Sequence, residues 1–211
     1  MFRELGNLEK LNLMSNRISL IERGTFEDLR QLIMLNLNNN QVHTLDPLAY
    51  SGLDNLQKLY MESNHLSLIP RSAFVRMHSL RHINLARNNL SDISSRMFVG
   101  VSKLEELFLS DNNIINIASD TFTVMPLLKV LNMGQNNIHT INKSCEKPSL
   151  KKLQELYLAN NPLECTCKIA WIHKLVLTGT KVEGKCRGPD LFRENRLMNL
   201  NFTLCDTEPC A

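Results

Sequence analysis

The sequence predicts an α/β solenoid, a curved stack of similar coils whose short parallel strands line the concave face. Three observations support this fold class. Leucines return with a period of 24 residues, leucines alternate as L-x-L inside each period, and an asparagine follows the second of these leucines by three residues. A period of this length is typical of a chain that repeats one strand and one turn in every coil.

The repeat is clearest between Leu104 and Met125, where the pattern is L-x-x-L-x-L-x-x-N-x-I-x-x-I-x-x-x-x-F-x-x-L. We number slots from the first leucine of each copy. Phe2 and Leu5 match the end of the pattern, so the chain opens within a repeat. We predict repeats over residues 1–160, with a partial copy at 1–7, and a cysteine-rich cap over 161–210. Full copies start at Leu8, Leu32, Leu56, Leu80, Leu104, Leu128 and Leu153.

The L-x-L segment has the period of a strand, with its leucines facing inward. Such a short strand cannot bury its apolar side alone, so the copies must stack into a parallel sheet with ~4.8 Å between strands. The Ile–Ile–Phe segment closes the other side. We expect the asparagine column to bond turn amides of its own and neighbouring coils, a structural role and not a ligand site. Its members are Asn16, Asn40, Asn64, Asn88, Asn112, Asn136 and Asn161.

The regular pattern ends in two places. The sixth repeat loses its phenylalanine and runs through a loop, NKSCEKPSL, that contains Cys145. The seventh breaks off at Asn161 and continues as NPLECTCKIAW, with a short apolar-faced helix expected from Ile169 to Leu177. An open solenoid end exposes core, so we interpret this segment as a cap.

These motifs strongly resemble the leucine-rich repeat family, in its extracellular 24-residue type. The end of the chain resembles the C-terminal cap of Slit, Toll-type receptors and variable lymphocyte receptors. The resemblance implies disulfides Cys165–Cys186 and Cys167–Cys205. It also implies that Trp171 covers the core of the last repeat.

The residues themselves leave the cysteine chemistry open. Four cysteines allow three pairings, and C-x-C…C…C is also compatible with a zinc site. Cys145 and Cys210 are expected to form a third bridge or, alternatively, a bond to another molecule. Disulfides indicate an oxidising compartment, and three glycosylation sequons agree with an extracellular protein, secreted or part of a membrane protein. The sequons begin at Asn89, Asn142 and Asn201.

The ends of the chain suggest a longer protein. No apolar run approaches the ~18–20 residues of a membrane span, and no signal peptide precedes the first repeat. Because a secreted protein needs such a signal, we expect further sequence before residue 1.

Charge and motifs argue against several functions. The net charge is +3, and residues 1–142 carry 13 basic and 13 acidic side chains, too balanced to indicate nucleic-acid binding. We find no catalytic motif, cofactor motif or metal-ligand set, so an enzyme is not predicted. His78 and His82 have the spacing of a helical metal pair, but a coil boundary separates them and they are interpreted as surface residues.

The remaining candidate is the sheet surface, where outward side chains occupy slots 3, 5 and 7. Exposed aromatics beside small or polar neighbours are typical of protein-binding surfaces, although strand propensity alone also favours aromatics there. We therefore expect a protein ligand on the concave face. The candidate residues are Met34, Tyr60, His82, Phe108, Val130 and Tyr157.

Two alternatives remain open. One is a structural spacer that binds nothing. The other is a glycan-binding module, with heparin or another glycosaminoglycan as the ligand, which uses the basic residues of the cap. These residues are Lys168, Lys174, Lys181, Lys185, Arg187, Arg193 and Arg196.

Overall fold

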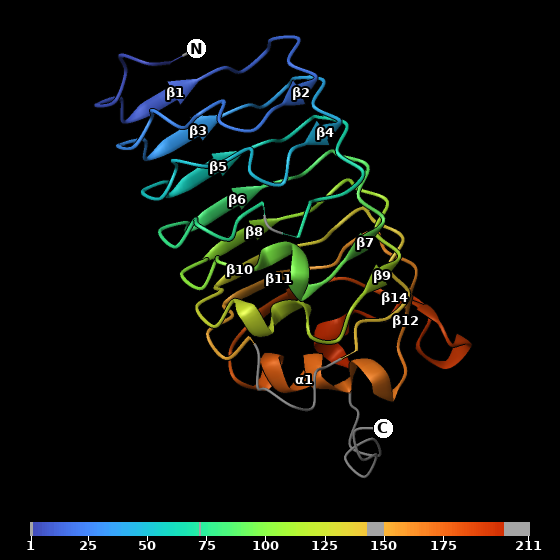
Figure 1. Ribbon diagram of the computed structural model, residues 1–211. Helices are drawn as coiled ribbons and strands as arrows, with labels where there is room; N and C mark the ends of the chain where they lie inside the picture. The colour runs from blue at the N-terminus through green and yellow to red at the C-terminus, as the bar shows by residue number, and fades with distance from the viewer. Residues whose placement is uncertain (1, 72, 143–149, 201–211) are drawn as a thin grey trace.

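The protein is a solenoid of stacked coils that ends in a small cap (Figure 1). The computed structural model describes residues 2–71, 73–142 and 150–200. Strands lie one above another along one side, and the cap helix lies at the end opposite the N-terminus. The predicted fold class is confirmed.

One parallel sheet runs through the whole molecule. The strands pair slot for slot, so Lys58 lies beside His82 and His82 lies beside Glu106. Seven strands occupy slots 3–5 of the seven repeats; the eighth, β13, comes from the cap and was not predicted. In spatial order the strands are β1 (Lys10–Asn12), β3 (Met34–Asn36), β5 (Lys58–Tyr60), β6 (His82–Asn84), β8 (Glu106–Phe108), β10 (Val130–Asn132), β11 (Glu155–Tyr157) and β13 (Lys181–Glu183).

The other side of the coils has shorter elements, as expected for the Ile–Ile–Phe segment. Two-residue strands form the parallel pairs β2–β4 and β7–β9. Their bounds are β2 (Leu20–Ile21), β4 (Thr44–Leu45), β7 (Asp92–Ile93) and β9 (Asn116–Ile117). The 3₁₀ turns η1 (Ser95–Phe98) and η2 (Thr121–Val124) place the convex phenylalanines Phe98 and Phe122 in the core.

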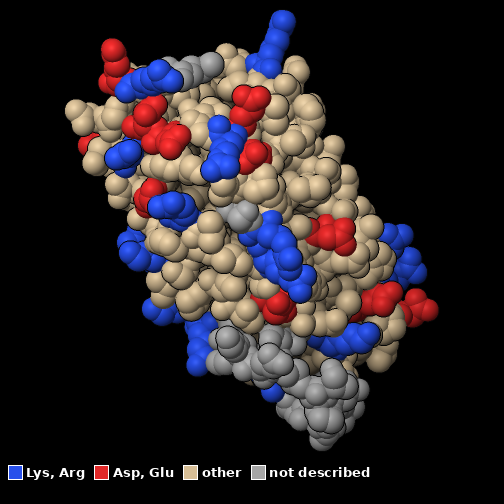
Figure 2. All heavy atoms as spheres, in the orientation of Figure 1, with Lys and Arg blue, Asp and Glu red and all other residues tan. Residues whose placement is uncertain are grey.

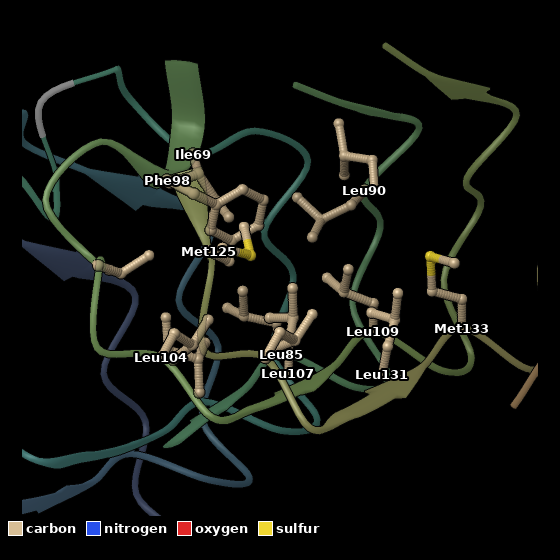
Figure 3. Close-up of a cluster of buried hydrophobic side chains, with 14 of the residues drawn as sticks. Ile69, Leu85, Leu90, Phe98, Leu104, Leu107, Leu109, Met125, Leu131 and Met133 are labelled. Atoms are coloured by element: carbon tan, nitrogen blue, oxygen red, sulfur yellow. The ribbon is translucent and has the colours of Figure 1, made fainter. Parts of the chain in front are cut away.

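The template leucines fill the space between the two sides (Figure 3). Leu104, Leu107 and Leu109 are fully buried. On the convex side Phe74 stacks on Tyr50 and on Phe98, with ring centroids 5.9 and 6.2 Å apart. Tyr50 thus takes the place of a phenylalanine, and its buried hydroxyl donates to Sδ of Met61 at 2.7 Å. Burial raises the pKa of this hydroxyl far above its ordinary value.

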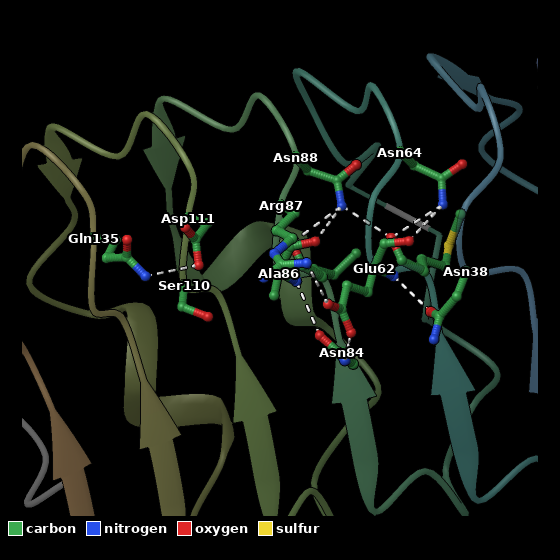
Figure 4. A network of polar contacts seen from close by, with 12 residues as sticks. Asn38, Glu62, Asn64, Asn84, Ala86, Arg87, Asn88, Ser110, Asp111 and Gln135 are labelled. Carbon is green, nitrogen blue, oxygen red and sulfur yellow. Dashed lines mark hydrogen bonds and ion pairs between the residues drawn. The ribbon is translucent and has the colours of Figure 1, made fainter.

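The asparagine column joins successive coils, as predicted (Figure 4). Nδ2 of Asn88 donates to the carbonyl of Met61 in the preceding coil at 2.9 Å and to that of Leu85 in its own coil at 3.1 Å. Oδ1 of Asn88 accepts from the Leu66 amide at 3.0 Å. Because these backbone groups are buried, the side chain supplies partners that water cannot. Asn16, which has no described coil before it, is exposed.

The residue before each asparagine adopts a left-handed backbone. Its φ lies between 54° and 59° in all seven repeats, including Arg87 at 55°. No glycine occupies this slot, so the sequence does not indicate the left-handed turn. The residues are Ser15, Asn39, Ser63, Arg87, Asp111, Gln135 and Asn160.

The cap closes the far end of the solenoid. Cys165 and Cys186 form a disulfide, and Trp171 Nε1 donates to the carbonyl of Ile141 at 2.8 Å. Cys167 is also disulfide-bonded. The predicted partner Cys205, together with Cys145, Cys210 and Asn201, lies outside the described residues.

The cap elements follow one another along the chain. Strand β12 pairs with β14, and α1 is the helix expected from Ile169 to Leu177, one residue shorter at its start. Across the described ranges, no helix has the length and apolar character needed to cross a membrane. The elements are β12 (Leu163–Glu164), η3 (Cys167–Ile169), α1 (Ala170–Leu177), β14 (Cys186–Gly188), η4 (Asp190–Phe192) and η5 (Leu197–Asn199).

Candidate site on the concave face

Three predicted residues form one continuous row of rings on the concave face. The ring of His82, on β6, lies between those of Tyr60 on β5 and Phe108 on β8, with centroid distances of 4.7 and 5.2 Å. Tyr60 and Phe108 are two strands apart, a separation of ~10 Å in a regular sheet. The imidazole therefore fills the gap between them. The sequence placed all three residues on this face but did not show that they touch.

A carboxylate holds the central ring. Nδ1 of His82 lies 2.8 Å from Oε2 of Glu106. Because a carboxylate accepts and does not donate, Nδ1 is the protonated nitrogen of this pair. Nε2 of His82 is buried and has no hydrogen-bond partner among the described residues. The row thus contains an unpaired polar atom at its centre.

The asparagines of slot 5 have a structural role that the sequence did not reveal. Oδ1 of Asn84 accepts from the amide two residues further on, at 3.0 Å, and Asn132 does the same at 3.1 Å. Asn12 and Asn36 repeat this bond. The side chain therefore closes the turn that follows each strand.

An aromatic residue at slot 5 cannot make that bond. In the Tyr60 repeat the amide of Glu62 is instead satisfied by Oδ1 of Asn38, from the neighbouring coil, at 2.7 Å (Figure 4). At slot 5, Tyr60 and Phe108 thus take the place of an asparagine, and the hydrogen bond that its side chain would make to the turn is absent. The coil does not require an aromatic residue at this slot.

Tyr157 belongs to a separate polar group at the cap end of the face. Its hydroxyl donates to the carboxylate of Glu155, and this bond raises the pKa of the phenol. Nζ of Lys181 lies 4.9 Å from the ring centroid and 3.0 Å from Oε1 of Glu183. The contact with Glu183, followed by that with Tyr157, raises the pKa of Lys181. Tyr157 is therefore held as a polar residue and not as an apolar anchor.

The other predicted residues flank the row. Met34 and Val130 are half-buried on β3 and β10, where Met34 pairs with Lys58 and Val130 with Glu106. His78, which the sequence paired with His82, is exposed in the preceding loop. The described residues include no cluster of three or more side chains able to hold a metal.

Two predicted sugar acceptors can be located. Asn89 and Asn142 are both exposed. Asn89 directly follows the buried Asn88 at a turn, and Asn142 ends the described part of the sixth repeat. Their modification stays a prediction.

Charges of both signs are interspersed over the face that Figure 2 shows. The concave face also carries both signs, because slot 3 is lysine on β5 (Lys58) and glutamate on β8 and β11 (Glu106 and Glu155). This surface has no single sign of potential.

A rigid sheet that presents half-buried rings on a stack of coils defines a solenoid recognition module. The chain belongs to the leucine-rich repeat family, whose model matches residues 6–66, 62–114 and 102–163. Proteins of this fold typically bind ligands and do not catalyse reactions.

Among solved structures, the chain resembles Toll-like receptor 13 (TLR13) in the crystal structure of the TLR13–ssRNA13 complex. The TM-score is 0.73 and the sequence identity is 27%. The match covers 77% of this chain and 23% of the TLR13 chain, so this chain spans about a quarter of that receptor. A search of curated proteins finds no match.

Proposed function

We propose that this chain is an extracellular recognition module that binds a protein ligand on its concave face, with the Tyr60–His82–Phe108 row at the centre of the contact. We further propose that residues 1–160 supply the binding surface, and that residues 161–210 form the cap. The module would be part of a receptor ectodomain or of a secreted adhesion or matrix protein. It would act without turnover or cofactor.

The continuous ring row is the observation that carries this proposal. Clustered aromatics in half-buried positions are the usual anchors of protein interfaces. The aromatics also replace asparagines that would close the turn, so the coil itself does not require them. A spacer would need neither feature.

The disulfide and the receptor-like fold support the extracellular location. TLR13 is found with RNA in its complex, but the mixed charges of this concave face favour a protein. RNA binding requires Lys and Arg side chains to neutralise successive phosphates. Here carboxylates such as Glu62 and Glu106 lie among the lysines.

A panel of secreted and cell-surface ectodomains, with a single-stranded RNA included, would test the proposal. Each binder is measured again with Phe108→Asn, which restores the asparagine found at this slot in neighbouring coils. We expect the variant to bind a protein ligand at least about tenfold more weakly. Ile115→Asn is the matched control, because Ile115 is exposed outside the sheet.

The proposal is wrong if every protein binder tolerates Phe108→Asn as well as it tolerates Ile115→Asn. Binding of RNA in preference to all proteins would also contradict it.

A further inference from the structure

A hollow lies at the cap end of the solenoid, apart from the ring row. This cap cleft has a volume of about 880 Å³ and is bordered by β13, the loop after it and the segment that leads into η5. The volume falls within the ~300–1,000 Å³ range of small-ligand sites. Five basic side chains line it: Lys181, Lys185, Arg187, Arg193 and Arg196.

Two of these cations occupy facing backbone positions. Lys185 and Arg196 form an antiparallel bridge. The flanking bonds run from the Cys186 amide to the Asn195 carbonyl and from the Leu197 amide to the Gly184 carbonyl, both at 3.0 Å. The bridge is therefore a non-hydrogen-bonded pair, the geometry in which facing side chains come closest.

Like charges in such a pair destabilise a sheet. Lys185 and Arg196 are therefore neighbouring positions of like charge, and the Glu194 carboxylate, 3.4 Å from Nζ of Lys185, offsets one of the two charges. Nothing in the backbone of this loop requires basic residues at both positions.

The two carboxylates of the cleft offset only part of its positive charge. Lys181 pairs with Glu183 at 3.0 Å, and Lys185 pairs loosely with Glu194 at 3.4 Å, where the Glu194 side chain is 73% exposed. Among the described residues, Arg187 and Arg196 have no ion pair. Five cations against two carboxylates leave the described lining residues with a charge of +3, and Asp190, which is not a lining residue, lies 3.9 Å from Arg193.

The lining also indicates the class of anion. None of the described lining residues is aromatic, so the cleft has no platform on which nucleobases could stack. Apolar side chains, such as Val176 and Met198, also line the cleft and can contact the carbon faces of sugar rings. Several cations in one open hollow suit a saccharide that carries several sulfate groups.

We propose that the cap cleft binds a sulfated oligosaccharide, with Lys185, Arg187 and Arg196 holding its sulfate groups. This site is separate from the proposed protein site. Lys168 and Lys174, which the sequence grouped with the other cap cations, do not line the cleft and take no part in it.

The test measures binding of a heparin-derived octasaccharide to the 211-residue chain by calorimetry at low and moderate salt. A hyaluronan octasaccharide, which has carboxylates but no sulfates, is the matched probe. Lys185→Gln combined with Arg196→Gln is the site variant. Arg96→Gln combined with Lys103→Gln removes the same charge from exposed positions outside the cleft and is the control.

We expect the site variant to bind the heparin octasaccharide about 100-fold more weakly, roughly tenfold for each charged hydrogen-bonding group. The control variant and Phe108→Asn should bind as wild type does. The unliganded site variant should melt within a few degrees of wild type, because both substituted side chains are exposed. A folded site variant therefore separates lost binding from lost structure.

Three results would overturn the proposal. The first is an equal loss in the site and control variants, which would indicate diffuse attraction. The second is equal binding of hyaluronan, and the third is tighter binding of a single-stranded RNA of the same length. Because the protein site is tested by Phe108→Asn on a different ligand, either proposal can fail while the other stands.

Discussion

The imidazole of His82 lies between the rings of Tyr60 and Phe108 while its Nδ1 contacts Glu106 at 2.8 Å. Four residues from three adjacent strands are thereby joined into one unit, although they lie up to 48 positions apart. The side chain of His82 is 16% exposed, which is low for a residue on an open sheet face.

His82→Ala should lower the free energy of unfolding by about 1–2 kcal/mol, since two ring contacts and one charged hydrogen bond are lost. Urea denaturation followed by circular dichroism measures this change. His78→Ala is the control, because His78 is exposed and should change stability by less than about 0.5 kcal/mol. Equal effects of the two substitutions would show that the ring row contributes nothing to stability.

Phe108→Asn should leave stability within about 1 kcal/mol of wild type. The lost ring contact with His82 is offset by a new bond from the Asn side chain to the amide of Ser110, as Asn84 and Asn132 make in their coils. Phe108→Ala, which cannot form that bond, is the comparison and should be the less stable variant. If alanine is the more stable of the two, the structural role assigned to slot 5 is wrong.

Asn112→Ala should destabilise the protein by about 3 kcal/mol, because the carbonyls of Leu85 and Leu109 and the amide of Leu90 lose their partner while buried. Asn16→Ala is the matched substitution in the first coil. It should cost less than about 1 kcal/mol, since the two carbonyls that Asn16 contacts are accessible to water. Chemical denaturation of both variants gives the difference.

Tyr50→Phe should be neutral or slightly stabilising at pH 7, because the buried hydroxyl contacts only a thioether among the described residues. Burial raises the folded-state pKa of Tyr50 above the unfolded value of about 10. The folded state therefore keeps the proton, and this contribution is complete below pH ~10 and is lost as pH rises beyond it.

Denaturation at pH 7 and pH 11 measures this effect, with the disulfides kept oxidised. Wild type should lose more stability than Tyr50→Phe between the two values. Parallel losses in the two proteins would mean that the Tyr50 hydroxyl can ionise in the folded state.

Replacing both Cys165 and Cys186 by serine should cost about 3 kcal/mol, the loop-closure contribution expected for a bridge between residues 21 positions apart. The cap should loosen before the repeats do. Trp171, the single tryptophan of the chain, bonds the Ile141 carbonyl and reports on the cap by fluorescence. Fluorescence and circular dichroism transitions that still coincide in the variant would argue against a separately loosened cap.

Much of the fold could be predicted because every coil buries the same kinds of side chain at the same slots. Leu107 is buried for the same reason as Leu59 or Leu131, and Asn112 bonds its neighbours as Asn88 does. Repetition therefore makes the structural residues visible as a period. The substitution of Tyr50 for phenylalanine could be understood in the same way, since its slot identifies it as a core position.

Other features follow from contacts that no period marks. The left-handed residues at slot 8 share a backbone angle but no residue type, and β13 extends the sheet although its sequence does not match the repeat. The slot-5 asparagines have the pattern of surface residues in the sequence, and only the structure shows their bonds to the turn. The cap cations were grouped by composition, and only their positions separate those that line the cleft from Lys168 and Lys174.

The sequence by itself determined the solenoid, its register of 24 residues and the face on which Tyr60, His82 and Phe108 lie. These depend on local periodicity and on the burial of leucines, which each coil encodes. The tertiary structure alone decided that His82 bridges the two aromatic rings and that Lys185 faces Arg196. The first depends on the direction in which the His82 side chain packs between its neighbours. The second depends on the backbone pairing of two cap segments, which only the packing of the folded chain brings together.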